Sequence, residues 1–147
     1  MERVGGIVII NGGIALMHRK NVTRPGQLIS DYYTFPGGGR ELGESREECL
    51  LRELQEELGI NVKIIRFFEE DYFELKGTYE YYYLCEYIDG NFGTGDGPEF
   101  QYDEKFKDSG DYIPEIVKMS EISNLTLLPE KIKNKLVKEY NEGKIKI

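Results

Sequence analysis

Hydrophobic positions in the N-terminal part of the chain either alternate with polar ones or run together, as in β-strands. The β-branched run Val4–Ile10 and the segment Ile14–Met17 flank Asn11-Gly12-Gly13, a combination that predicts a β-hairpin. Similar patterns predict further strands at residues 32–35, 62–73, 78–89 and 112–119. Alternate tyrosines of the 78–89 strand share one face. Sheet packing is the favoured interpretation of that face, and stacking of a nucleobase is the alternative.

Two other segments carry apolar residues three and four positions apart, which predicts helices. The first has a capping-box pattern at Ser45 and Glu48 and a terminating Gly59. The second opens at Pro129-Glu130 and stops near Gly143. The inner faces of the two helices are expected to hold Leu50, Leu51, Leu54 and Leu58 in the first, and Ile132, Leu136, Val137 and Tyr140 in the second.

This mixture of strands and helices predicts one layered α/β (α+β) domain covering residues 1–147. The net charge of −8 argues against nucleic-acid or anionic-membrane partners, because both need a basic surface. There is no apolar run of 18 residues and no leader pattern, so a cytoplasmic location is expected. Cys49 and Cys85 have no metal-ligand spacing, and Cys49 is interpreted as a small packing residue.

The first predicted helix carries a row of acids on one side. Glu53, Glu56 and Glu57 are related as i, i+3 and i+4, so their carboxylates are neighbours and repel one another. A hard divalent cation such as Mg²⁺ offsets this repulsion, because it binds carboxylate oxygens and keeps positions for water and phosphate. Arg52 is placed to hold a carboxylate by charge-assisted hydrogen bonds. The glycines of segment 35–39 leave backbone open to a ligand, or to a metal through a carbonyl.

Together these residues resemble the Nudix box, G-x5-E-x7-R-E-U-x-E-E-x-G-U, in which U is a bulky aliphatic residue. Every fixed position is matched, by Gly38, Glu44, Arg52, Glu53, Leu54, Glu56, Glu57, Gly59 and Ile60. A salt-bridged surface helix, the alternative, accounts for the charges but not for the glycines and the spacing. The resemblance implies the Nudix α/β/α sandwich with a mixed sheet, and hydrolysis of a nucleoside diphosphate linked to a further moiety.

The resemblance also implies roles for individual residues. Glu53, Glu56 and Glu57 would bind Mg²⁺ or Mn²⁺ together with the backbone carbonyl of Gly37. Arg52 would orient the Glu53 or Glu56 carboxylate, while Gly38 and Glu44 would support the box. Glu53 or Glu56 is favoured as general base. The rival base, or additional metal ligand, is a downstream acid: Glu99 is the candidate, with Asp96, Asp103 and Glu104 as alternatives.

A nucleoside triphosphate, oxidised or otherwise noncanonical, is the favoured substrate, cleaved to a nucleoside monophosphate and pyrophosphate. It is favoured because the motifs typical of NADH, ADP-ribose and dinucleoside-polyphosphate branches are missing or displaced. Another nucleotide conjugate (a dinucleoside polyphosphate, ADP-ribose or a sugar nucleotide) or a non-hydrolysing nucleotide-sensing module is the alternative, and a homodimer is compatible with either. His18 is expected at the surface or half-buried without a role. Arg19 is interpreted as a solvated strand end rather than a phosphate contact.

Overall fold

A mixed β-sheet forms the centre of the structure, a computed structural model that describes residues 1–23, 25, 30–96 and 110–147. Its strands, among the described residues, are β1 (Glu2–Ile10), β2 (Gly13–Lys20), β3 (Tyr32–Thr34), β4 (Gly37–Gly39), β5 (Ile60–Phe73), β6 (Thr78–Gly90), β7 (Asp111–Lys118) and β8 (Leu127–Leu128). The strand order is β5-β6-β1-β2-β3-β8, with β4 paired to β1 and β7 paired to β2. The β1–β6 and β3–β8 pairs are parallel, whereas the other pairs are antiparallel.

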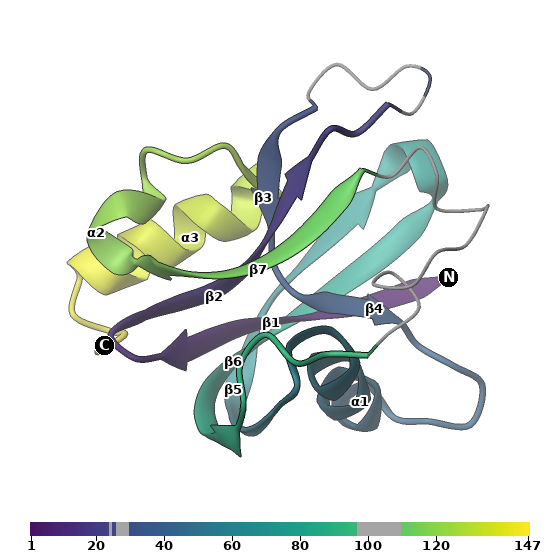
Figure 1. Cartoon of the computed structure of the whole chain (residues 1–147), viewed down its shortest axis with the longest axis horizontal. Helices are drawn as coiled ribbons and strands as arrows, with labels where there is room; N and C mark the ends of the chain where they lie inside the picture. The colour runs from purple at the N-terminus through teal and green to yellow at the C-terminus, as the bar shows by residue number, and fades with distance from the viewer. Residues whose placement is uncertain (24, 26–29, 97–109) are drawn as a thin grey trace.

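Helices cover both faces of this sheet. Helix α1 (Arg46–Leu58) packs on one face, and α2 (Met119–Ile122) and α3 (Glu130–Asn141) lie on the other (Figure 1). Each interface has its own apolar cluster: Val8, Leu50, Leu54 and Leu58 belong to the first, and Ile7, Leu16, Ile132 and Leu136 to the second. The α/β/α arrangement expected from the sequence is therefore confirmed. No helix in the described parts of the chain is long and apolar enough to span a membrane.

The predicted N-terminal hairpin is confirmed, because β1 and β2 pair with Ile10 opposite Gly13. Asn11 and Gly12 form the two-residue turn with positive φ angles of 48° and 77°, the backbone that tight hairpin turns require. The strands expected at 62–73, 78–89 and 112–119 correspond to β5, β6 and β7, although Met119 begins α2 instead of ending β7. The two- and three-residue strands β8 and β4, and the one-turn helix α2, are too short to show a period.

Helix α1 begins and ends where its sequence predicts. Ser45 accepts a hydrogen bond from the Glu48 amide while the Glu48 carboxylate accepts one from the Ser45 amide, which completes the capping box. Gly59 ends the helix in the left-handed conformation with φ 73°. The placement of Leu51 on the buried face was wrong, since 43% of this residue is exposed. Leu51 lies about 100° around the helix from Leu50, at the edge of the buried face.

The tyrosine face of β6 packs mainly against the core beneath α1. Tyr83 is buried, Tyr81 and Tyr87 pack against the same apolar cluster, and Tyr79 is half-exposed near the hairpin tip. This confirms sheet packing as the role of most of the row. Two hollows beside these tyrosines, of about 340 and 520 Å³, share Arg46 and Glu47, and none of the box acids lines them.

The expected exposure of His18 and Arg19 was wrong, because both residues are buried. Strand β2 pairs with β3 on one edge and with β7 on the other along its C-terminal half, so its end is covered. The His18 ring nitrogens contact the carboxylates of Asp31 and Glu115. The Arg19 guanidinium lies 3.8 Å from the centre of the Tyr112 ring.

Candidate active site

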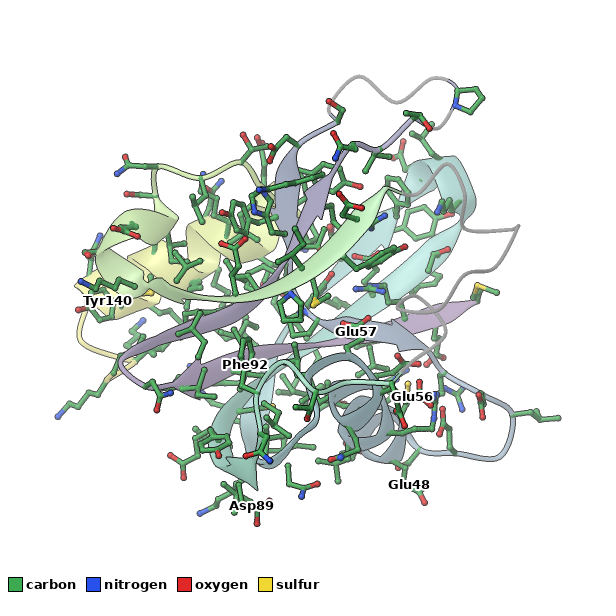
Figure 2. All side chains as sticks on the ribbon, in the orientation of Figure 1. Glu48, Glu56, Glu57, Asp89, Phe92 and Tyr140 are labelled. Atoms are coloured by element: carbon green, nitrogen blue, oxygen red, sulfur yellow. The ribbon has the colours of Figure 1, made fainter. Side chains whose placement is uncertain are left out.

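The glycine turn and the acidic side of α1 meet at Glu57. Strand β4 pairs with β1, with Gly37 opposite Gly5, and this pairing places the turn against the helix. The Gly37 amide donates to Glu57 Oε2 at 3.2 Å, and only 7% of Glu57 is exposed. Figure 2 shows Glu57 on the side of α1 that faces the sheet, Glu56 beside the loop that precedes the helix, and Glu48 pointing away. The buried carboxylate is thus fixed from the turn as well as from the helix.

The absence of side chains in this turn is a packing requirement. A Cβ atom built on Gly38 would lie 2.3 Å from the carboxyl carbon of Glu53. A Cβ atom on Gly37 would lie 2.1 Å from the backbone oxygen of Val4. Both distances are shorter than any ordinary van der Waals contact, so only glycine lets the turn approach the acids and the neighbouring strand this closely.

Arg52 connects the acids to one another. Its Nη2 lies 2.6 Å from Glu44 Oε1 and its Nε lies 3.1 Å from Glu44 Oε2, a two-pronged contact. Its Nη1 lies 2.9 Å from Glu53 Oε1 and 3.3 Å from Glu56 Oε2. Nη2 also donates to the backbone oxygen of Gly39 at 3.2 Å. One guanidinium therefore ties the loop before α1, the glycine turn and two acids of the helix together.

These contacts shift the ionisation of the partners. The hydrogen bonds from Arg52 and from the Glu41 amide lower the pKa of Glu44 from 4.5 to about 2, so this carboxylate stays charged in weak acid. The hydrogen bond to Glu44 and the nearby Glu53 raise the pKa of Arg52. Burial raises the pKa of the Cys49 thiol to about 12, which leaves it protonated and unreactive, in agreement with a packing role.

Arg3 holds the glycine turn from the opposite side. Its guanidinium donates to the backbone oxygens of Phe35 at 3.0 Å and Gly37 at 3.3 Å. Burial works to lower the pKa of Arg3, but the neighbouring Tyr82 and Glu57 outweigh it, and the pKa is raised. The Gly37 carbonyl, assigned to a metal by resemblance, therefore already accepts one hydrogen bond on this chain. A carbonyl oxygen has two lone pairs, so one remains for a cation.

A cleft of about 350 Å³ opens between these groups. Glu53 and Glu57 line one side, and Arg3, Arg19 and Lys76 contribute three positive charges to the same cleft. The sequence did not identify Arg3 or Lys76 as site residues, and a phosphate contact was the less favoured interpretation of Arg19. A basic residue at the start of a buried strand was the available signal for Arg3; Lys76 comes from the 3₁₀ turn η1 (Glu74–Lys76), distant in sequence.

The donor set of the cleft fits a hard divalent cation. Carboxylate oxygens and a backbone carbonyl are the ligands that Mg²⁺ and Mn²⁺ prefer. The Glu53 carboxylate occupies the space beside Gly38 that a side chain at this position would otherwise fill. Within the described residues, no three His, Cys, Asp or Glu side chains are already grouped as metal ligands. Arg52 and the Gly37 amide hold the box carboxylates instead.

The downstream acids are only partly placed. Glu99, Asp103 and Glu104 lie outside the described residues. Asp96 is exposed and follows Gly95, whose added Cβ atom would lie 2.3 Å from the backbone oxygen of Glu56. The chain after β6 therefore passes against the end of α1 that carries the acids.

Comparisons with known proteins agree on one family. The family model described as NUDIX domain matches residues 2–106. An 8-oxo-dGTP diphosphatase of Haemophilus influenzae is 31% identical over 97 residues, which cover 64% of this chain and 71% of that protein. An RNA pyrophosphohydrolase of Hamiltonella defensa is 37% identical over 68 residues, which cover 46% of this chain and 42% of that protein.

Solved structures share the fold at lower identity. A MutT structure from a study of Aliivibrio salmonicida and Vibrio cholerae has a TM-score of 0.66 and 24% identity, covering 94% of this chain and 97% of that one. The ORF135 protein of E. coli has a TM-score of 0.62 and 23% identity, covering 97% and 89%. At these identities the likeness concerns the fold alone.

Proposed function

Because the chain belongs to the Nudix family of hydrolases, we propose that it cleaves a phosphoanhydride bond in a nucleoside triphosphate, releasing a nucleoside monophosphate and pyrophosphate. The observation that carries this proposal is the cleft in which two box glutamates and three cationic side chains face the same space. A triphosphate is a chain of anions, and its cleavage depends on positioning and charge neutralisation more than on covalent help.

The cationic side of the cleft accounts for phosphate binding. The Arg19 and Arg3 guanidiniums are fixed, the first by the Tyr112 ring and the second by two backbone carbonyls. Arginine held in this way presents its remaining N–H groups to phosphate oxygens with little loss of side-chain entropy. Lys76 adds a point charge on a long side chain from the tip of the β5–β6 hairpin. These cations offset the net charge of −8 at the place where substrate binds.

The anionic side supplies the metal ligands. Nudix hydrolases use divalent ions, and we assign Mg²⁺ or Mn²⁺ to Glu53, Glu56, Glu57 and the Gly37 carbonyl of this chain. The bound ions neutralise phosphate oxygens and lower the pKa of an attacking water. Arg52 positions Glu53 and Glu56, and either can take the proton of that water. Glu53 lines the cleft, and Glu56, with 33% of its side chain exposed, is linked to Glu53 through Arg52. Glu99 is the alternative base.

The choice of a triphosphate is supported by the named activity of the Haemophilus influenzae relative, an 8-oxo-dGTP diphosphatase. The Hamiltonella defensa relative is named for action on RNA, and it is a second candidate. A long RNA is disfavoured here by the acidic surface, because RNA binding depends strongly on neutralised phosphates.

The test is a substrate panel with the purified chain and Mg²⁺ or Mn²⁺. The panel contains normal and oxidised nucleoside triphosphates, a 5′-triphosphorylated RNA oligonucleotide, ADP-ribose, a diadenosine polyphosphate and a sugar nucleotide. We expect monophosphate and pyrophosphate from a nucleoside triphosphate, identified by ³¹P NMR and mass, and no turnover in EDTA. Cleavage confined to one of the conjugates, or to the RNA, would refute the proposal.

A further inference from the structure

A second cavity, of about 460 Å³, adjoins the glutamate cleft. Arg3, Arg19 and Lys76 line both spaces, so a ligand whose phosphates lie beside these cations can extend from one space into the other. Leu128 and Pro129, which directly precede α3, form part of the wall. The cavity therefore lies on the face of the sheet opposite α1, within the size range of sites that bind small organic ligands.

The walls of this cavity combine apolar surface with hydrogen-bond acceptors. Phe73 and Pro129 supply flat or rigid apolar surface, suited to the faces of an aromatic ring, and the almost fully buried Tyr82 completes this part of the lining. Asp71 on β5 and Glu80 on β6 are direct partners in the strand register, and both line the cavity. Both are half-buried. The acceptors therefore stand together on two neighbouring strands.

Two carboxylates placed directly opposite each other repel and destabilise a sheet, so this pair lowers the stability of the fold when no ligand is bound. The Tyr82 hydroxyl donates to Glu80 Oε1 at 2.7 Å and fixes the orientation of that carboxylate. A carboxylate has about four lone-pair positions, so Glu80 keeps the capacity to accept further hydrogen bonds. Because ionised carboxylates only accept, this edge of the cavity selects a ligand edge that presents N–H donors.

We infer that this cavity binds a guanine-type base, an inference that rests on the proposed triphosphate substrate. Glu80 accepts hydrogen bonds from the ring N–H and the exocyclic amino group of the base, and Asp71 supplies a second acceptor. Guanine presents these two donors side by side. Adenine and cytosine present a ring-nitrogen acceptor beside their amino group, and uracil has no amino group. Adenine and cytosine would therefore offer the carboxylate one donor beside an acceptor, and uracil one ring N–H between two carbonyl groups, so each satisfies the carboxylate less well than guanine does.

The matched substrates GTP and ITP test this inference, because they differ only in the 2-amino group. One charge-assisted hydrogen bond corresponds to a preference of roughly tenfold to a hundredfold. We expect kcat/KM for GTP to exceed that for ITP by such a factor in the native chain. In Glu80→Gln the ratio should fall to about one, since the amide places an N–H group against a base donor.

The Glu80→Gln variant should fold, because the side-chain oxygen of the introduced amide can still accept the Tyr82 hydroxyl. The matched control is Glu86→Gln, the same charge change on the same strand at an exposed position outside the cavity. It should retain the native GTP-to-ITP ratio. Equal effects of Glu80→Gln on both nucleotides would overturn the inference, and they would identify the acids as a general counter-charge for Arg3 and Lys76.

A binding measurement separates this inference from the proposed hydrolysis. The α,β-methylene analogues of GTP and ITP are titrated calorimetrically in the presence of Mg²⁺. If neither GTP nor ITP is cleaved but the GTP analogue still binds at least tenfold tighter in a Glu80-dependent manner, the cavity assignment holds and the hydrolysis proposal fails. If triphosphates are cleaved while the two analogues bind equally, the cavity assignment fails and the hydrolysis proposal stands.

Discussion

Arg52 makes its shortest contact with Glu44, 2.6 Å from Nη2 to Oε1, although Glu44 precedes it by eight positions and lies outside α1. The contact is two-pronged, so Glu44 fixes the plane of the guanidinium as well as its position. In that orientation Nη1 faces Glu53 and Glu56. Glu44 therefore acts on the acid row through Arg52 and is a positioning residue for the proposed chemistry.

The pH dependence of stability tests this arrangement. Because the pKa of Glu44 falls from 4.5 in the unfolded chain to about 2 in the folded one, its stabilising contribution is complete above pH 4.5. It is lost as the pH falls from about 4.5 towards 2. We expect the difference in Tm between the native chain and Glu44→Gln to be constant above about pH 5 and to shrink in more acidic buffers. Differential scanning calorimetry from pH 2.5 to 7 measures it, and a difference independent of pH would contradict the contact.

Glu57→Gln separates charge from packing. The amide oxygen of glutamine can still accept the Gly37 amide, so the free energy of unfolding should change by only about 1 kcal/mol. Loss of the negative charge should lower kcat by about a hundredfold or more, in line with the loss of a preorganised electrostatic group. The control is Glu47→Gln on the same helix, whose amide oxygen can still accept the Tyr83 hydroxyl. Near-native turnover of Glu57→Gln would exclude the proposed ligand set.

Gly38→Ala should displace the Glu53 carboxylate, because the new methyl group would lie 2.3 Å from its carboxyl carbon. We expect a loss of activity of tenfold or more by order of magnitude, with weaker Mn²⁺ binding detected by electron paramagnetic resonance. In a Glu53→Ala background the same substitution has no carboxylate to displace. Its further effect there should be small, which makes the two changes strongly non-additive. Additive losses would show that Gly38 acts through another contact.

The thiols should be protected from modification in the folded chain. Burial raises the pKa of both Cys49 and Cys85 to about 12, and both side chains are fully enclosed. We expect no reaction with a chromogenic disulfide reagent at pH 8, and two equivalents of reaction after unfolding in guanidinium chloride. Rapid reaction of the native chain would place one cysteine at an accessible, functional position.

Local signals accounted for much of the fold. Asn11-Gly12, Ser45 with Glu48, and Gly59 each specify a backbone conformation by their own chemistry, and all three lie where the sequence predicted. The acids Glu53, Glu56 and Glu57 were likewise predicted to be neighbours from their spacing, and all three lie on α1. The strands β4 and β8 were not predicted, because β4 consists of three glycines without side chains, β8 has only two residues, and both owe their conformation to their partner strands.

The misplaced residues depend on pairing between distant segments. His18 and Arg19 were assigned to a surface strand end, but β7, almost a hundred positions later, pairs along β2 and covers them. Arg3 and Lys76 reach the cleft from β1 and from the tip of the β5–β6 hairpin. No spacing rule relates these positions to α1, so only the folded topology brings them to the acids.

The leucines and the glutamates of interest lie on the same helix, α1. Its buried leucines belong to one of the two separate apolar clusters. Any change that tilts or rotates α1 therefore moves the glutamates that we propose as metal ligands, so substitutions on that side of the sheet are expected to lower turnover. The opposite layer, with α3 and the second cavity, packs through the other apolar cluster, and Arg3, Arg19 and Lys76 connect its cavity to the cleft of the acids. Descendants of this chain would most easily acquire new base preferences by varying that layer, with the hydrolytic apparatus inherited intact.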